Sequence, residues 1–349
     1  MGRVLRVLVI DDSAYVRKVV REILSRSPFI EVVGTARDGL EALDLVERLE
    51  PDVVTCDLIM PELDGVGFVR EQMKRRPLPI IIMSIANETA EAALTALDAG
   101  AIDFVLKPTA LATEKIFDVS NELIEKVKAA GSISLNRIPR APLPETVAAI
   151  EQATEIPGSG SVDMVVLGIS TGGPQALKRL IPQLPADLPV PLLMVMHMPV
   201  GYTEMYAKKL NEQSALEVRE AAEGDEVKPG MAFLAPAGRH LSLKRDSGGK
   251  VVTHLDARPF NTLHRPAVDV LFQSAAEVYG KRVLGVVMTG MGSDGKEGAA
   301  WIKSQGGLVF TEAESSCVVY GMPGSVVEAG LSDKSVALED MARAIREVV

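Results

Sequence analysis

Three reactive side chains in the second half of the chain each follow a short apolar run. Ser170 follows MVVLGI, His197 follows PLLMVM, and Asp294 lies in the glycine-rich loop after VLGVVM. Such runs are typical of buried parallel strands, whose carboxyl ends meet at one edge of a sheet. A serine, a histidine and an aspartate at that edge could act as nucleophile, general base and base-orienting carboxylate. The pattern predicts a serine hydrolase site.

The sequence around Ser170 fits a nucleophile elbow. Gly168-Ile169-Ser170-Thr171-Gly172 matches the G-x-S-x-G pattern, and a helix is expected over Gly173–Leu184. Backbone N–H groups at the start of that helix could stabilise an oxyanion. The motif alone is weak, because a capping turn or a phosphate-binding loop has a similar composition, although the lysine of a Walker motif is absent. The order Ser, His, Asp along the chain differs from that of α/β-hydrolases, so we expect another fold.

Four histidines are candidates for the general base. His197 is favoured because it follows its strand directly and one strand-helix-strand unit separates it from Ser170, which predicts neighbouring strands. His240 and His254 lie in a hairpin region and are interpreted as solvent-facing or locally bonded. His264 precedes a helix in LHRPAVDVLF, where a capping or structural role is favoured over a catalytic one. The glycines around Asp294 are interpreted as allowing close approach of the backbone to a ligand.

A second group of reactive residues occupies the first half. Each stands at or just after the end of an expected strand: Asp11 and Asp12 after the first, Asp57 at the third, Ser84 at the fourth and Lys107 at the fifth. They should therefore meet at one edge of one sheet. Three carboxylates there favour a divalent cation, and Mg²⁺ suits oxygen ligands and an incoming phosphate. The lysine and the hydroxyl group could then bind phosphoryl oxygens, whereas a helix cap would explain only the acidic pair.

Two α/β domains are expected to position these residues. Residues 1–130 alternate strands and helices as in a doubly wound sheet, with strands expected at Val4–Ile10, Glu31–Ala36, Val53–Cys56, Ile80–Met83 and Ile102–Leu106 and a last helix at Glu114–Ala129. Residues 131–160 are rich in Pro, Ser, Gly and Ala and are interpreted as a linker, with a short helix at Glu145–Thr154. Residues 161–349 form a second alternation, in which Met231–Leu255 predicts an inserted β-hairpin turning at Asp246-Ser247-Gly248-Gly249.

Length and composition narrow the class of protein. A chain of 349 residues predicts two domains. The net charge of −10 argues against nucleic-acid binding as the main activity. Cys56 and Cys317 lie in different halves, which argues against a disulfide framework and fits a reducing cytoplasm. No apolar run approaches the length of a membrane span, and the N-terminus lacks the pattern of a signal peptide, so a cytoplasmic location is expected.

The first half resembles the receiver domain of two-component response regulators. The resemblance covers about the first 127 residues and rests on DDS at 11–13, CDLIMPELDG at 56–65, MSI at 83–85 and FVLKP at 104–108. It implies a flavodoxin-like fold with Asp57 as the phosphoacceptor and a histidine kinase as the phosphodonor. It further implies Mg²⁺ bound by Asp11, Asp12, Asp57 and the carbonyl of Ile59, and three switch residues, Ser84, Phe104 and Lys107.

The second half resembles the catalytic domain of the chemotaxis protein-glutamate methylesterase (CheB) family. The segments GISTGGP, MHMPVGYT, HRPAVDVLF, MTGMGSDG and CVVYGMPG carry the resemblance. It implies Ser170 as nucleophile, His197 as base and Asp294 as orienting acid, with Thr171 beside them and the Met291 backbone N–H as an oxyanion donor. The expected fold is a Rossmann-like parallel-sheet domain with an inserted β-hairpin.

The two resemblances together imply a phosphorylation-activated enzyme. It would remove methyl groups from glutamyl γ-methyl esters of methylated chemoreceptors and deamidate specific receptor glutamines. No cofactor is expected at the hydrolase site, and the protein would meet the membrane only through its receptors. The alternative is a phosphorylation-gated binding protein with an inert hydrolase half. The presence of all three triad residues, Ser170, His197 and Asp294, argues against that alternative.

Overall fold

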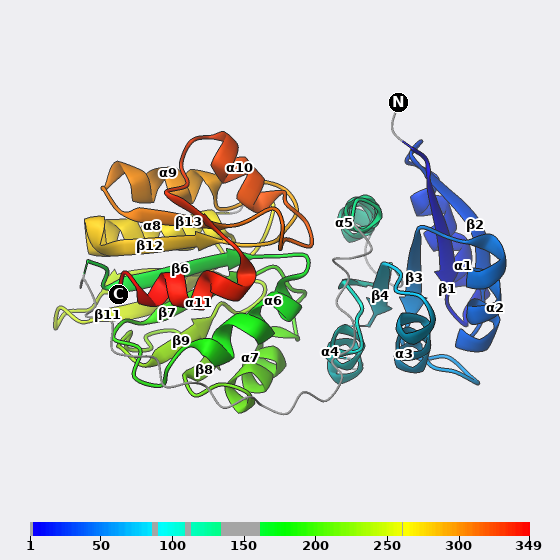
Figure 1. Cartoon of the computed structure of the whole chain (residues 1–349), viewed down its shortest axis with the longest axis horizontal. Helices are drawn as coiled ribbons and strands as arrows, with labels where there is room; N and C mark the ends of the chain where they lie inside the picture. The colour runs from blue at the N-terminus through cyan, green and yellow to red at the C-terminus, as the bar shows by residue number, and fades with distance from the viewer. Residues whose placement is uncertain (1–2, 86–89, 109–112, 134–160, 260) are drawn as a thin grey trace. The chain divides into compact units, whose positions relative to one another are not determined.

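The computed structural model describes residues 3–85, 90–108, 113–133, 161–259 and 261–349, with the backbone alone for 113–118. The chain divides into two compact units, Met1–Glu145 and Thr146–Val349 (Figure 1). The expected linker at 131–160 and its short helix at Glu145–Thr154 fall almost entirely outside the described residues. They remain predictions, and the two units are described separately.

The first unit is a five-stranded parallel sheet in the order β2-β1-β3-β4-β5. Its strands are β1 (Leu5–Ile10), β2 (Ile30–Ala36), β3 (Val53–Asp57), β4 (Ile80–Ser84) and β5 (Asp103–Leu106). Its helices are α1 (Ala14–Leu24), α2 (Gly39–Leu49), α3 (Gly65–Arg75), α4 (Ala90–Asp98) and α5 (Thr113–Gly131). Helix α1 packs against α5, while α3 packs against both α2 and α4, so both faces of the sheet are covered (Figure 1). The five expected strands are all present, and the predicted doubly wound fold is confirmed.

Local sequence explains how these elements begin. β3 and β4 are buried along their whole length, as their uninterrupted apolar character requires. Polar caps start the helices that follow three of the strands: Ser13 accepts a hydrogen bond from Val16 N, Asp38 from Glu41 N and Asp64 from Gly67 N. The chain therefore turns sharply at the carboxyl end of each of these strands, where the polar residues lie.

The second unit is built on a seven-stranded parallel sheet in the order β14-β13-β12-β6-β7-β9-β8. Its strands are β6 (Met164–Ile169), β7 (Leu192–Met196), β8 (Glu217–Glu220), β9 (Met231–Leu234), β12 (Val283–Val287), β13 (Leu308–Glu312) and β14 (Lys334–Val336). Its α-helices are α6 (Gly173–Leu180), α7 (Thr203–Glu212), α8 (Val268–Tyr279), α9 (Lys296–Ser304), α10 (Met322–Glu328) and α11 (Leu338–Arg346). Helices α8, α9 and α10 lie on one side of the sheet and α6, α7 and α11 on the other (Figure 1).

The predicted hairpin is present beside this sheet. β10 (His240–Arg245) pairs antiparallel with β11 (Val251–Asp256) in a sheet of its own. Asp246 fixes the turn, because its carboxylate accepts hydrogen bonds from Gly248 N and Lys250 N. The hairpin packs on α8, where Ser274 Oγ accepts a hydrogen bond from Leu243 N at 3.1 Å.

Two boundaries differ from the sequence prediction. Met231–Leu234, expected within the hairpin region, is β9 and pairs with β7 and β8 of the main sheet. The helix expected to reach Leu184 ends at Leu180 and continues as a 3₁₀ turn, η2 (Ile181–Gln183). Pro182 lies in that turn and lacks the N–H that another α-helical hydrogen bond would need. A second 3₁₀ turn, η3 (Gly280–Arg282), follows α8.

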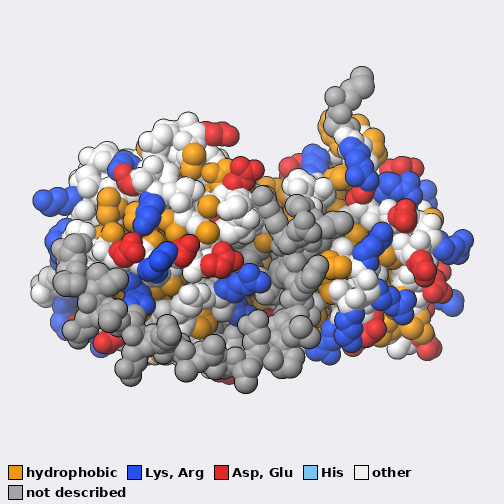
Figure 2. Space-filling model, viewed as in Figure 1, with side chains coloured by type: hydrophobic (Ala, Val, Ile, Leu, Met, Phe, Trp, Pro, Cys, Tyr) orange, Lys and Arg blue, Asp and Glu red, His pale blue; other side chains and the backbone are white. Residues whose placement is uncertain are grey.

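The surface carries both signs of charge. On the face shown in Figure 2, Lys and Arg side chains are interspersed with Asp and Glu side chains over both units. Within the described part of the chain, no helix combines the length and the apolar character needed to cross a membrane.

Candidate active site and phosphorylation site

The structure brings Ser170, His197 and Asp294 together at one edge of the second sheet. Ser170 follows β6, His197 follows β7, and Asp294 lies between β12 and α9. β6 pairs with both β7 and β12, as the short spacing between Ser170 and His197 predicted for the first pair. His197 Nδ1 lies 3.1 Å from Ser170 Oγ, and His197 Nε2 lies 2.8 Å from Asp294 Oδ2. With the proton on Nε2, the imidazole donates to the carboxylate and leaves Nδ1 free to accept the serine proton.

Asp294 is held by the start of α8 as well as by His197. Its Oδ2 accepts a hydrogen bond from Val268 N at 2.8 Å, and its Oδ1 accepts one from Asp269 N at 3.0 Å. Burial alone would raise the pKa of Asp294, but the hydrogen bond and charge of His197 and these two amides lower it to about 2. The carboxylate is therefore ionised at neutral pH and can orient an imidazole and stabilise an imidazolium.

His264 lies closer to this site than the sequence analysis indicated. Its ring stacks on that of His197, with 4.0 Å between centroids and 24° between planes. The sequence favoured a capping or structural role for His264. The stacking contact is consistent with a structural role, in which His264 packs against the proposed base. The segment HRPAVDVLF also supplies Val268 and Asp269, whose amides hold Asp294. The relation of this segment to the site depends on its path after the hairpin, which a linear pattern does not reveal.

The residues expected at the oxyanion position lie in the loops around Ser170. Thr171 is buried, and its carbonyl accepts a hydrogen bond from Thr289 Oγ1 at 2.9 Å. Ser170 N donates to Thr289 O at 2.9 Å, which ties the nucleophile to the loop carrying Met291. Gly290 lies so close that a Cβ built there would come within 2.8 Å of Ser170 Cβ. The oxyanion roles of Thr171 and of the Met291 N–H stay predictions.

Sequence reasoning missed a buried carboxyl group beneath this loop. Glu312, at the end of β13, is fully buried, and its Oε2 accepts a hydrogen bond from Thr289 N at 2.9 Å. Ser316 Oγ donates to its Oε1 at 3.0 Å. Burial raises the pKa of Glu312 against the effect of these hydrogen bonds. A single acidic residue at the end of the apolar run LVFTE was the available signal, but many strands end in a solvated glutamate.

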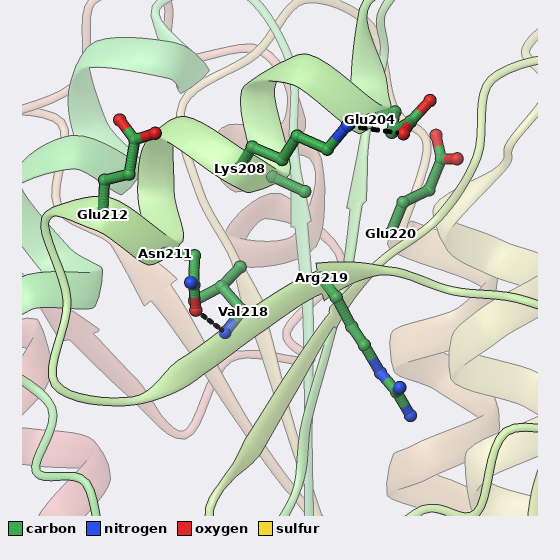
Figure 3. Close-up of a pocket in the computed structure, with 8 residues that line it drawn as sticks. Glu204, Lys208, Asn211, Glu212, Val218, Arg219 and Glu220 are labelled. Atoms are coloured by element: carbon green, nitrogen blue, oxygen red, sulfur yellow. Dashed lines mark hydrogen bonds and ion pairs between the residues drawn. The ribbon is translucent and has the colours of Figure 1, made fainter.

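A charged pocket opens elsewhere on this unit, between α7 and β8 (Figure 3). Its volume is about 410 Å³, and its lining includes none of the predicted site residues. Lys208 Nζ bonds Glu204 at 2.7 Å, and Asn211 Oδ1 accepts a hydrogen bond from Val218 N at 2.9 Å. Several of its polar groups therefore bind one another, and we assign it no part in the reaction.

The first unit gathers the predicted phosphorylation residues at the edge of its sheet. The carboxylates of Asp11, Asp12 and Asp57 each offer an oxygen within 4.8 Å of the others. Lys107 Nζ lies 2.9 Å from Asp11 Oδ2 and 2.7 Å from Asp57 Oδ2. Hard oxygen donors at this spacing fit Mg²⁺, and the exposed side chain of Asp12 leaves the cluster open to solvent.

The ionisable groups of this cluster shift one another's pKa values. Burial raises the pKa of Asp57, although the hydrogen bond and charge of Lys107 oppose that rise. Burial alone would lower the pKa of Lys107, but its hydrogen bonds to Asp57 and Asp11 outweigh burial and raise the lysine pKa. The ammonium is therefore kept charged where a phosphoryl group would need it.

The expected switch residues lie on neighbouring strands. Ser84 at the end of β4 and Phe104 in β5 are both buried. Lys107 N donates to Ser84 O at 2.8 Å, which joins the ends of these strands. The side chain of Ile59 is exposed, and its carbonyl as a metal ligand stays a prediction. The roles of Ser84, Phe104 and Lys107 as switch residues likewise stay predictions.

Comparisons with known proteins agree with both sites. Residues 165–345 match the family model of the CheB methylesterase, and residues 7–117 match that of the response regulator receiver domain. The chain is 49% identical over 347 residues to protein-glutamate methylesterase/protein-glutamine glutaminase 5 of Myxococcus xanthus, covering 99% of this chain and 98% of that protein. It is 44% identical over 357 residues to the protein-glutamate methylesterase/protein-glutamine glutaminase of Symbiobacterium thermophilum, covering 99% and 98%.

A solved structure gives the same result for the second unit. The CheB methylesterase catalytic domain of Thermotoga maritima is 43% identical with a TM-score of 0.53, covering 54% of this chain and 99% of that one. The chain therefore belongs to the CheB methylesterase family and carries a response regulator receiver domain ahead of its methylesterase domain.

Proposed function

We propose that this protein is a protein-glutamate methylesterase that hydrolyses glutamyl γ-methyl esters of chemoreceptors. The observation that carries the proposal is the hydrogen-bonded series Ser170–His197–Asp294 in a chain whose relatives bear that enzyme name. Ser170 Oγ attacks the ester carbonyl carbon while His197 Nδ1 takes the serine proton. Asp294 stabilises the imidazolium that forms, because it is ionised and hydrogen-bonded to Nε2.

The acyl-enzyme then forms and breaks by the same groups. The imidazolium returns its proton to the methoxy oxygen, the C–O bond breaks, and methanol leaves. Water next attacks the acyl-serine with His197 again as base, which releases a glutamate carboxylate and restores Ser170. The N–H groups at the start of α6 and the Met291 N–H are the proposed donors to the oxyanion of each tetrahedral intermediate. Deamidation of receptor glutamines follows the same course with ammonia as leaving group.

Phosphorylation of Asp57 is the proposed control. Bound Mg²⁺ would offset the charge that builds on the transferring phosphoryl group. Asp11, Asp12, Asp57 and the Ile59 carbonyl would hold it, while Lys107 and Ser84 bind phosphoryl oxygens. A chemotaxis histidine kinase is the proposed donor, and the expected location is the cytoplasm. The proximity of Lys107 to both Asp11 and Asp57 supports this part of the proposal.

Methanol release from methylated receptor membranes tests the enzymatic proposal. The full chain should release methanol faster with a small phosphodonor and Mg²⁺ than without them. Ser170→Ala should release none above background, whereas Ser242→Ala, in the hairpin, should keep wild-type activity. If wild-type protein binds these membranes but releases no methanol, the chain is a phosphorylation-gated binding protein and the enzymatic proposal is wrong.

A further inference from the structure

We propose that Asp269 is a positioning residue of the hydrolase site, acting through Asp294 on the proposed base His197. Its carboxyl group holds the backbone that follows Asp294 through Gly295 N and Gly298 N. Its charge sets how much negative charge the two acids together present to the imidazole. The inference rests on the triad roles proposed above. Neither the motif carrying Ser170 nor the strand-end pattern pointed to Asp269.

Asp269 and Asp294 each accept hydrogen bonds from the start of a neighbouring helix. The carboxylate of Asp294 accepts from Val268 N and Asp269 N at the start of α8. In return, Asp269 Oδ1 accepts from Gly295 N at 2.9 Å and from Gly298 N at 2.7 Å at the start of α9. The first backbone N–H groups of a helix have no partner within the helix. Asp294 accepts from two of these groups in α8, and Asp269 accepts from two at the start of α9. Movement of either helix would move the carboxylate that faces His197.

Close packing keeps this arrangement fixed. A Cβ built on Gly298 would lie 2.5 Å from Phe272 Cβ and 3.0 Å from Asp269 Cα, so only glycine fits where α9 meets α8. Gly298, one of the glycines around Asp294 that the sequence analysis interpreted as allowing close approach to a ligand, thus allows close contact between two helices. The Asp269 carboxyl group cannot turn away from Asp294 without breaking its bonds to Gly295 and Gly298.

The two acids are also tied together by their backbone amides, because Asp269 N donates to Asp294 Oδ1 and Gly295 N, next to Asp294, donates to Asp269 Oδ1. Two partly buried carboxylates that lie near each other repel, so a proton on one of them is favoured. Burial, followed by the charge of Asp294, raises the pKa of Asp269 to about 6, whereas that of Asp294 is lowered to about 2. The proton therefore belongs to Asp269. Below about pH 6 this proton leaves the Asp269 carboxyl group uncharged. Above that pH both Asp269 and Asp294 are ionised.

Other ionisable groups around the pair come from several elements. His197 follows β7 and pairs with Asp294, while His264 stacks on His197. His240 in β10 feels the charges of Asp294 and Arg265, and burial lowers its pKa. On α9, Lys296 pairs with Glu297 at the surface. Asp269 differs from these groups because its backbone N–H donates to the Asp294 carboxylate and its side chain accepts from Gly295 N beside Asp294.

The charge on Asp269 should therefore influence the reaction. An ionised Asp269 favours the imidazolium that forms as Ser170 attacks, whereas a protonated one contributes no such charge. Asn at this position keeps an acceptor for Gly295 N and Gly298 N and a donor toward Asp294, but it cannot ionise. At pH 8, Asp269→Asn should lower kcat about tenfold with KM unchanged, the effect of one partly screened charge several ångströms away.

The test is the pH dependence of ester hydrolysis by the full chain between about pH 5 and 9. Wild type should show an ionisation near pH 6 that Asp269→Asn lacks, while Asp340→Asn, an exposed acid in the first turn of α11, should behave as wild type. Identical profiles for wild type and Asp269→Asn would overturn the inference. Loss of activity in Ser170→Ala in the same assay tests the triad separately, so failure of one proposal is distinguishable from failure of the other.

A second measurement follows the ionisation of Asp269 directly and does not depend on enzymatic activity. Carbon NMR of wild-type protein labelled at aspartate carboxyl carbons should contain a carboxyl signal that titrates near pH 6 and is missing from Asp269→Asn. Asp294→Asn should move that titration toward the ordinary aspartate range, because the repelling neighbour is gone. If no aspartate carboxyl group of the wild type titrates near pH 6, or if that titration persists in Asp269→Asn, the inference is wrong.

Discussion

Gly290→Ala should disable the hydrolase site through a single added carbon. A Cβ on Gly290 would lie 2.4 Å from Met322 Sδ, 2.8 Å from Ser170 Cβ and 3.1 Å from Ser170 N. Backbone hydrogen bonds restrict movement of both Ser170 and Met322. Ser170 N is bonded to Thr289 O, and Gly290 O accepts hydrogen bonds from Gly321 N and Met322 N at 3.0 and 2.8 Å. The new methyl group therefore has to displace the nucleophile relative to the loop that carries Met291.

The size of the effect follows from these distances. Carbon atoms in ordinary contact are about 3.5–4.0 Å apart, so Ser170 must move by roughly 1 Å. A misplacement of about 1 Å costs on the order of 100-fold in rate. We expect kcat/KM for methanol release to fall about 100-fold, mainly through kcat. Overpacking should also lower the free energy of unfolding by about 1–3 kcal/mol.

The assay is methanol release under saturating phosphodonor, together with denaturant unfolding of the same preparations. Gly280→Ala is the control, because alanine is strained there by a φ of 57°, whereas a Cβ meets nothing within 4 Å. It should lose about 1–2 kcal/mol of stability and keep its activity. A folded Gly290→Ala protein that works at the wild-type rate would refute the view that this contact fixes Ser170.

Three further predictions concern other parts of the chain. His197→Ala should lose several orders of magnitude in kcat with a methyl ester, and Asp294→Asn should lose less, since the carboxylate only orients and stabilises the base; equal losses in steady-state kinetics would contradict this order. Asp57→Asn, or chelation of Mg²⁺ in wild type, should abolish labelling by radioactive acetyl phosphate, and labelling that persists with chelator present would rule out the metal cluster. Glu312→Ala should destabilise the fold by about 1–3 kcal/mol in denaturant unfolding because Thr289 N loses its buried acceptor, whereas Glu312→Gln should lose less.

The strand-end residues were predictable because their placement depends on short-range patterns. A buried apolar run ends where a polar residue and a glycine begin, and parallel strands bring such ends to one edge. Ser170, His197 and Asp57 are all of this kind, and the structure has β6 beside β7 as the sequence indicated. The end of α6 was misjudged because amphipathic character continues past Leu180, whereas Pro182 decides the hydrogen bonding.

Residues whose role depends on long-range packing were not predictable. His264, which follows the hairpin in the chain, stacks on His197, which follows β7. Glu312 looks like an ordinary strand-ending acid, yet β13 places it under Thr289. Asp269 looks like a first-turn acid of α8, and its hydrogen bonds to Asp294, Gly295 and Gly298 exist only when α8 packs on α9. Each of these contacts joins residues that no local periodicity connects.

The order of strands explains why the acid needs such support. β6 lies between β7 and β12, so Asp294, which follows β12, has to extend past the β6 loop to reach His197, which follows β7. Gly290 lets the connecting loop run against Ser170 on the way, and the amides of Val268 and Asp269 receive the carboxylate at the far end. A long loop alone would leave that carboxylate mobile. The start of α8 supplies the rigidity that the loop lacks, so changes in the segment HRPAVDVLF should alter the rate even though the nucleophile and the base are untouched.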